Sequence, residues 1–154
     1  MMGGHRIERS VDIDAPAHAV WAVLEDVRRL PDFSPSTVAV DAPARLSKAG
    51  QTFTQTVRLA GRSFTSTWTV TEIAPGTRLV IEGSVLPGTH YEMAESIRAT
   101  GDASTTFTLV MDYHLPFGPL GRLAGKLGAE QRAVEEAELV LDGVRRSAEA
   151  ATAA

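Results

Sequence analysis

The sequence predicts an α+β domain in which an antiparallel sheet packs against a long C-terminal helix. Three observations predict this class. Apolar and acidic residues alternate over 7–14, short alternating stretches separated by turn residues fill 51–115, and apolar residues recur every three or four positions over 120–144. The chain has 154 residues, which suits a single domain, 1–154, with room for a core and a cavity.

The first element is a strand that runs directly into a helix. Alternation over 7–14 is typical of a strand with one buried face. Pro16 ends this strand and is predicted to start the helix, because a first helical residue has no partner for an amide hydrogen and proline lacks one. The helix has one apolar face, formed by Val20, Leu24 and Val27. The Leu30-Pro31 step then breaks the pattern, and 33–35 predict a tight, partly buried corner.

Residues 51–115 are predicted to form successive hairpins whose registers can be derived from the sequence. A two-residue turn at 60–61 places Phe53 opposite Trp68, and a turn centred on Asp102 places Met93 opposite Met111. These registers leave a threonine-rich set outside. The apolar residues of the predicted inner face are Phe53, Val57, Phe64, Trp68, Val70, Leu79, Ile81, Met93, Ile97, Phe107, Leu109 and Met111. Its polar exceptions are Gln55, Tyr91, Glu95 and Tyr113.

The C-terminal segment is predicted to form an amphipathic helix that covers this inner face. Its apolar stripe is Leu120, Leu123, Leu127, Val134, Ala137, Leu141 and Val144. Its predicted solvent-exposed face is Glu130, Arg132, Glu135, Glu136 and Glu138. Glycines at 118, 121, 125 and 128 each cost up to about 1 kcal/mol relative to alanine, so this end should be loose or broken. Two interpretations are open: a mobile ligand gate, or a close approach of helix to sheet. The alanine-rich tail after about residue 147 is expected to fray.

Several segments together resemble a known family. They are the strand, helix and corner of 11–35 (VDIDAPAHAVWAVLEDVRRLPDFSP), residues 68–72 (WTVTE) with Pro75-Gly76, and residues 113–118 (YHLPFG). Over nearly the whole chain, this set resembles the START-like, Bet v 1-like superfamily of polyketide cyclases, dehydrases and lipid-transfer proteins, also called SRPBCC. The resemblance implies a helix-grip fold, in which about seven curved strands surround the C-terminal helix and two short helices follow the first strand. No catalytic signature of the family can be placed residue by residue, and Phe33 stands where the family often has tryptophan.

Glu95 is the strongest candidate for a chemically active group. A carboxylate between Met93 and Ile97 on an apolar face costs several kcal/mol unless it is protonated, paired or hydrogen-bonded. Gln55, a tyrosine, water or a ligand are the candidate partners. The alternative is that Glu95 lies near the end of the sheet and is solvated.

The resemblance and the inner face together predict binding of a small, largely apolar molecule, such as a lipid, polyketide or aromatic metabolite. The predicted ligand-binding residues are Phe53, Gln55, Val57, Phe64, Trp68, Ile81, Tyr91, Met93, Glu95, Leu109, Met111, Tyr113, Leu123 and Leu127. A competing hypothesis is a polyketide cyclase or dehydratase, with Glu95 as general acid or base and Tyr91 or Tyr113 polarising a carbonyl. A third hypothesis is an interaction or stress protein with a vestigial pocket.

The composition argues against several other classes. A net charge of -4 without long basic runs argues against nucleic acid as a partner. The lack of cysteine excludes disulfides and thiolate chemistry. His90 and His114 fall opposite one another on the outer face without a third ligand, so neither a metal nor another cofactor is predicted. No apolar run approaches the ~20 residues of a membrane span, and no signal peptide is recognisable, so a cytoplasmic protein is expected. The preference for arginine over lysine in an alanine-rich chain indicates a bacterial source. A monomer or weak homodimer is expected.

Overall fold

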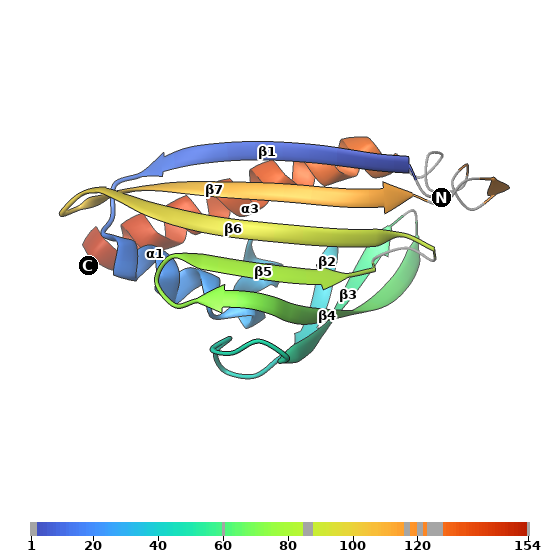
Figure 1. Ribbon diagram of the computed structural model, residues 1–154, viewed down its shortest axis with the longest axis horizontal. Coiled ribbons are helices and arrows are strands. Elements are labelled where there is room, and N and C mark those ends of the chain that lie inside the picture. The colour runs from blue at the N-terminus through green and yellow to red at the C-terminus, as the bar shows by residue number, and fades with distance from the viewer. Residues whose placement is uncertain are drawn as a thin grey trace.

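The computed structural model describes residues 3–59, 61–84, 88–115, 118–119, 122 and 128–153. The strands are β1 (Gly3–Ile13), β2 (Thr37–Asp41), β3 (Thr52–Leu59), β4 (Arg62–Ala74), β5 (Arg78–Gly83), β6 (His90–Gly101) and β7 (Ser104–Leu115). They form one antiparallel sheet in the order β1-β7-β6-β5-β4-β3-β2. Helix α1 (Ala17–Leu24) and the short 3-10 helix η1 (Val27–Asp32) join β1 to β2, and α3 (Ala129–Ala153) lies across one face of the sheet (Figure 1). The predicted fold is confirmed.

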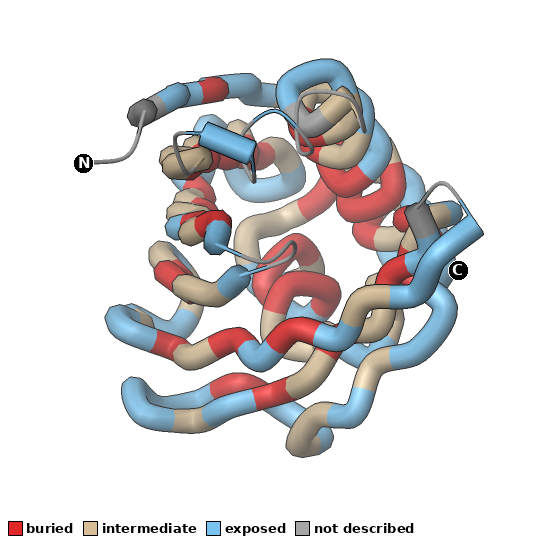
Figure 2. The backbone as a smooth tube through the Cα atoms, turned by 90° about the vertical axis from the view of Figure 1, so that its right-hand side faces the viewer, coloured by how far each residue is buried: buried red, intermediate tan, exposed pale blue. Residues whose placement is uncertain are grey.

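The registers derived from the two hairpins are also confirmed. Phe53 pairs with Trp68, and Met93 pairs with Met111. Trp68 is buried whereas its neighbour Thr67 is exposed, so the inner face was assigned correctly. The end-on view in Figure 2 shows the strands bending around the helices, with buried stretches of sheet and helix facing a shared interior.

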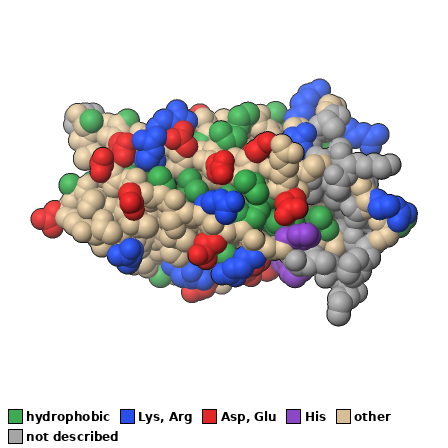
Figure 3. Space-filling view, turned by 90° about the horizontal axis from the view of Figure 1, so that it is seen from above, with side chains coloured by type: hydrophobic (Ala, Val, Ile, Leu, Met, Phe, Trp, Pro, Cys, Tyr) green, Lys and Arg blue, Asp and Glu red, His purple; other side chains and the backbone are tan. Residues whose placement is uncertain are grey.

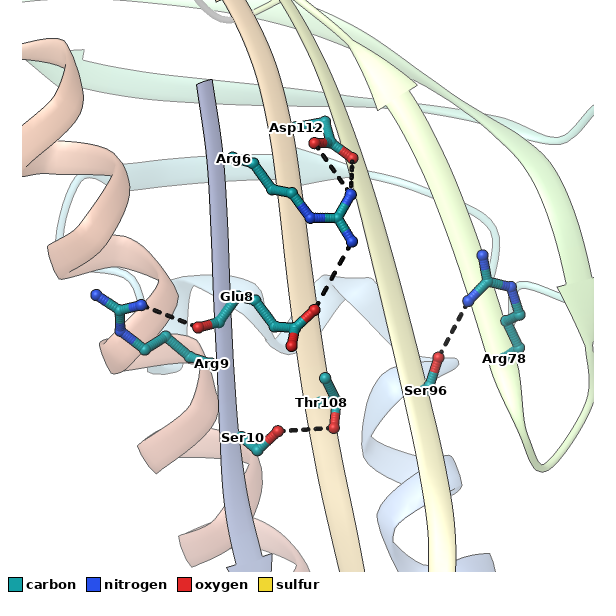
Figure 4. Close-up of polar contacts among 8 residues, drawn as sticks. All are labelled: Arg6, Glu8, Arg9, Ser10, Arg78, Ser96, Thr108 and Asp112. Atoms are coloured by element: carbon teal, nitrogen blue, oxygen red, sulfur yellow. Dashed lines mark hydrogen bonds and ion pairs between the residues drawn. The ribbon is translucent and has the colours of Figure 1, made fainter. Parts of the chain in front are cut away.

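The outer, convex face of the sheet is polar. Cross-strand side-chain pairs on this face join Arg6 to Asp112, Ser10 to Thr108 and Arg78 to Ser96 (Figure 4). The exposed ion pair between Arg6 and Asp112 contributes little to stability, typically about 0 to 1 kcal/mol. The apolar side chains of the inner face pack against the helices and form the buried core.

Helix α1 begins one residue later than predicted. Pro16 has an extended ψ of 156° and occupies the N-cap position, and its carbonyl accepts a hydrogen bond from the amide of Ala19 at 3.0 Å. The helix also ends at Leu24, so Val27 belongs to η1 instead of continuing the apolar face of α1. Both differences are boundary corrections, because the end of a helix depends on local backbone geometry that apolar spacing does not record.

The predicted corner at 33–35 follows η1 and packs closely against α3. Phe33 and Ser34 are buried, and the ring of Phe33 lies directly against Gly143 of α3. A Cβ atom at position 143 would overlap this ring. A glycine inside a helix is normally unfavourable, so here its absent side chain allows the corner to approach the helix.

Helix α3 differs from the expected C-terminal helix at both ends. Gly128 has a φ of 71°, which an α-helix does not accommodate, so α3 starts after a break at this residue. Fraying was expected after residue 147, whereas α3 continues to Ala153, with Ala148 fully buried and Glu149 accepting a hydrogen bond from the Asp14 amide at 3.0 Å. Positions 120, 121, 123–127 lie outside the described residues, so the ligand gate stays a prediction.

The molecular surface carries mixed charge. On the face seen in Figure 3, acidic and basic side chains are interspersed. Within the described ranges, no helix is both long enough and apolar enough to cross a membrane.

Replacing Gly143 with alanine should lower the free energy of unfolding by about 1 to 3 kcal/mol, the usual cost of forcing an extra group into a packed interior. The better helix propensity of alanine, about 1 kcal/mol, acts in the opposite direction and should not compensate for the overlap with Phe33. Urea denaturation measures the change. Glu138→Ala, at an exposed position of the same helix, is the control and should change stability little, because its ion pair with Arg9 is exposed. A Gly143→Ala variant more stable than the wild type would contradict the contact.

Candidate functional site

The structure contains a cavity of about 150 Å³, partly open to solvent, between the inner face of the sheet and the helices. The sheet contributes Phe53, Gln55, Val57, Trp68, Ile81, Tyr91, Met93, Glu95 and Met111 to its wall. The helices contribute Val27, Leu30, Arg132, Ala133, Glu136 and Val140, and the segment just after the corner contributes Ser36. The sheet residues share one face because successive side chains of a strand alternate between faces, and the cavity wall is consequently mostly apolar.

Most of the predicted ligand-binding residues lie in this wall, but three of them do not line it. Leu109 and Tyr113 are buried in the packed part of the core, and Phe64 is half-buried elsewhere on β4. Leu123 and Leu127 lie outside the described residues. Alternation along a strand identifies the inward-facing residues but does not say which of them border a cavity. These three residues were therefore placed on the correct face of the sheet but do not line the cavity. Ligand binding by the residues that do line the cavity stays a prediction.

The residues that sequence analysis missed come mainly from α3. Arg132 and Glu136 were expected on the solvent-exposed face of the helix, yet both are half-buried and line the cavity. They are spaced four residues apart and are followed four residues later by Val140, which also lines the cavity. This spacing places all three on one side of the helix and was the available signal. The assignment was wrong because polar residues facing a cavity look like surface residues in a sequence.

Glu136 is held at the cavity by two short hydrogen bonds from the corner after η1. Its carboxylate accepts from the hydroxyl of Ser34 at 2.7 Å and from the hydroxyl of Ser36 at 2.6 Å. The Ser34 hydroxyl also lies 2.8 Å from the hydroxyl of Thr37, the first residue of β2. Helix α3 is thus tied to the corner and to the edge of the sheet by hydrogen bonds to a carboxylate, which are about twice as strong as neutral ones.

The same chain of hydrogen bonds continues across the sheet through Gln55. The amide nitrogen Nε2 of Gln55 donates to Thr37 Oγ1 at 2.8 Å, and its oxygen Oε1 accepts from the indole Nε1 of Trp68 at 2.9 Å. The Trp68 indole also donates to Ser66 Oγ at 3.1 Å. These bonds satisfy polar groups that are buried on an otherwise apolar face. Gln55 is therefore not the partner of Glu95 that the sequence suggested.

Glu95 is the unusual group of the site. It is 9% exposed, and no hydrogen bond to its carboxylate is present among the described residues. Burial in these apolar surroundings raises its pKa to about 7. A carboxyl group with this pKa exchanges its proton near neutral pH, so it can act as either general acid or general base.

Glu95 also lies where two cavities adjoin. A second cavity of about 40 Å³ lies behind it towards α1, and its wall includes Asp26, Leu79 and Val144. Both cavities share Glu95 and several apolar neighbours. A space of this size exceeds the ~10 to 15 Å³ that one water molecule requires.

Four rings form a continuous series on the inner face. His5 stacks on Tyr113 with centroids 4.9 Å apart, Tyr113 stacks on Tyr91 at 5.4 Å, and Tyr91 lies 6.4 Å from Trp68 in a tilted arrangement. Burial, and secondarily the neighbouring Tyr113, raise the pKa of Tyr91 to about 12, and burial also raises the pKa of Tyr113. Both phenols therefore remain protonated at neutral pH. Tyr91 and Trp68 offer their rings to the cavity, and the buried Tyr113 hydroxyl has no partner in the part of the chain that the structure describes.

The histidines on the outer face lie where the sequence placed them. His90 pairs with His114, and their ring centroids are 6.5 Å apart. Among the described residues, no group of three or more histidine or acidic side chains could hold a metal ion.

Comparisons with known proteins agree with the geometry. The family model described as polyketide cyclase / dehydrase and lipid transport matches residues 4–149. The Zhui aromatase/cyclase from Streptomyces sp. R1128 is 21% identical, with a TM-score of 0.80 over 96% of this chain and 94% of that chain. The di-domain ARO/CYC BexL from the BE-7585A biosynthetic pathway is 18% identical, with a TM-score of 0.75 over 95% of this chain and 50% of that chain. A START superfamily protein from Mycobacterium smegmatis is 20% identical, with a TM-score of 0.66 over 92% and 98% of the two chains.

No curated protein sequence matches the chain. At such low identities, the solved structures show a shared fold and do not transfer an activity. The family model, in contrast, spans nearly the whole chain, from β1 to the last turns of α3. This protein therefore belongs to the polyketide cyclase/dehydrase and lipid transport family.

Proposed function

We propose that this protein binds a small, largely apolar molecule in the cavity between the sheet and α3. The observation that carries this proposal is the cavity of about 150 Å³, walled mostly by apolar side chains. Protein interiors are normally packed without large voids, and a concave apolar site with a few polar groups is the usual form of a small-molecule site. Members of this family typically bind small apolar molecules, which supports the proposal.

The size and lining of the cavity suggest which ligands to test first. The space suits a compact bicyclic molecule, and the rings of Trp68 and Tyr91 offer flat contact surfaces. The neighbours described as aromatase/cyclases favour an aromatic or polyketide-like ligand, and the family description adds lipids. The cysteine-free composition supports a reducing, cytoplasmic location.

A second candidate function is a cyclase or dehydratase acting on a polyketide-like chain. The observation that favours it is Glu95, which lines the cavity with a pKa raised to about 7 by burial. As a carboxylate, Glu95 would remove a proton from a carbon beside a ketone while the Tyr91 hydroxyl donates a hydrogen bond to the ketone oxygen. The protonated Glu95 would then return this proton to a departing hydroxyl group, so that a carbon–carbon double bond forms and water leaves.

The binding proposal predicts that the wild type binds tetralin, a bicyclic hydrocarbon, with perturbed NMR signals for the Met93 and Met111 methyl groups. Ala133→Leu, which adds three carbons at the helix side of the cavity, should weaken this binding about 10-fold or more by occupying the ligand's space. Ala99→Leu is the matched control, because Ala99 is exposed on β6 and should leave binding unchanged. Failure of the wild type to bind, or equal binding by Ala133→Leu, would refute the proposal. Native mass spectrometry of the purified protein would identify any retained ligand.

Replacing Glu95 with glutamine separates binding from catalysis. A binding protein should keep or improve its affinity for tetralin, because a costly buried ionisable group has been removed. An enzyme should instead lose turnover of a polyketide-like substrate by about 10² or more while binding persists. The two measurements are an affinity titration and an assay of dehydration. Turnover by Glu95→Gln equal to that of the wild type would show that Glu95 is not a catalytic residue.

Glu95 should also make stability depend on pH. Its pKa of about 7 in the folded protein lies above its ordinary value of 4.5, so the folded state binds this proton more tightly than the unfolded state. The resulting stabilisation is fully present below pH ~4.5 and is lost as the pH rises through ~7. The wild type should therefore lose up to about 3 kcal/mol of unfolding free energy relative to Glu95→Gln between pH ~4 and ~8, because glutamine does not titrate.

Urea denaturation at both pH values measures this difference. Glu92→Gln is the control, because Glu92 is exposed on the same strand and should give no such growth. A difference between wild type and Glu95→Gln that does not change with pH would show that Glu95 titrates normally.

A further inference from the structure

The orientation of the Gln55 amide can be derived from its neighbours. A glutamine side chain has one oxygen that accepts and one nitrogen that donates two hydrogens, whereas the indole nitrogen of Trp68 can only donate. The atom of Gln55 that faces the Trp68 indole at 2.9 Å must therefore be its oxygen. The amide nitrogen consequently faces Thr37, to which it donates at 2.8 Å.

The hydroxyl groups beyond Thr37 are oriented in the same direction. The Ser34 hydroxyl has a single hydrogen, and it points to Glu136 Oε2 at 2.7 Å because a carboxylate only accepts. In the bond between Thr37 and Ser34, Thr37 must then be the donor. Every hydrogen in the chain thus points towards the carboxylate, in the order Trp68, Gln55, Thr37, Ser34 and Glu136.

This arrangement leaves one hydrogen of Gln55 unused. Thr37 accepts one of the two hydrogens on Nε2, and the second has no acceptor within the described ranges of the chain. Gln55 is 9% exposed and lies in the cavity wall between the apolar residues Phe53 and Val57. A buried donor without a partner is unfavourable, so an acceptor atom on a ligand in the cavity would relieve this cost.

We propose that Gln55 is a specificity-determining residue, which donates its second amide hydrogen to a carbonyl oxygen of the ligand, and that Glu136 is the residue that positions it. Glu136 acts through Ser34 and Thr37 by holding the Thr37 hydroxyl as the acceptor for the Gln55 nitrogen, while the Trp68 indole sets which end of the amide faces Thr37. This inference rests on the proposed binding function and adds a selection rule to it. Among apolar molecules of one shape, the cavity prefers the one that carries a ketone.

The test compares 1-tetralone with tetralin, which share a bicyclic skeleton and differ by one ketone oxygen. The quantity measured is the ratio of the two affinities, which is compared between each variant and the wild type. The hydration of the two ligands is the same in both measurements, so it cancels in this comparison. Gln55→Met should lower the preference for tetralone by about 3- to 10-fold, the range expected for one neutral hydrogen bond. In this variant the Trp68 indole retains its bond to Ser66, so it is not left unpaired.

Glu136→Gln tests the positioning role. A glutamine at this position can donate to Ser34, so the hydroxyl hydrogens of Ser34 and Thr37 can reverse. The Trp68 indole still holds the Gln55 oxygen, but Thr37 is no longer held as the acceptor for the Gln55 nitrogen, which is then positioned less firmly. The preference for tetralone should fall about 3-fold, and the side-chain amide NMR signal of Gln55 should shift or broaden. Glu138→Gln is the matched control, because it makes the same change of charge on an exposed position of α3 and should leave both readouts unchanged.

The outcomes separate this inference from the binding proposal. Tetralin binding with an unchanged preference in Gln55→Met overturns the donor role of Gln55 while the binding function stands. An unchanged preference and an unchanged Gln55 signal in Glu136→Gln overturn the positioning role, and failure of the wild type to bind either ligand overturns both proposals. If Gln55→Met does not fold, the wild type decides, because its Gln55 amide signal should respond to 1-tetralone and not to tetralin.

Discussion

A curved seven-stranded sheet has more inward surface than one long helix can cover, and this mismatch shapes the rest of the structure. Where α1 and α3 meet the sheet, the interior is filled, and Phe107, Leu109 and Tyr113 are almost completely buried. Where the helices do not fill the curve, a cavity of about 150 Å³ is left. The position of α3 therefore sets both the core and the site, and the contact between Phe33 and Gly143 sets how closely the helix meets the corner.

The two buried polar side chains Gln55 and Glu95 differ in how their burial is compensated. The Gln55 oxygen accepts from the Trp68 indole, and its nitrogen is linked through hydroxyl groups to Glu136, so a polar chain joins β4 to α3. Glu95 has no hydrogen-bonding partner in the described part of the chain, and its burial is accommodated by a pKa of about 7. The first arrangement rigidifies the wall and orients a donor, whereas the second keeps a proton exchangeable near neutral pH.

These two arrangements bear on the choice between binding and catalysis. Both candidate functions use the same cavity, and the fold alone supports either, because one fold hosts many functions. An oriented donor selects a ligand without transforming it, and an exchangeable proton matters only if a bond is made or broken. The distinction consequently rests on Glu95, while ligand choice rests on Gln55 and the residues that position it.

The sequence by itself determined the strands, their registers and the inward face, because alternation and cross-strand pairing are properties of residues close in the chain or joined by short turns. Phe53 opposite Trp68 and the burial of Glu95 followed from this local information. Tertiary structure decided which side of α3 faces the cavity. The polarity of Glu136 predicted a solvent-exposed position, whereas the fold places it in the cavity wall. It also decided that Leu109 packs in the core and that Ala148 is buried. The hydrogen bond between Ser34 and Glu136 joins residues 102 positions apart, a pairing that no local pattern encodes.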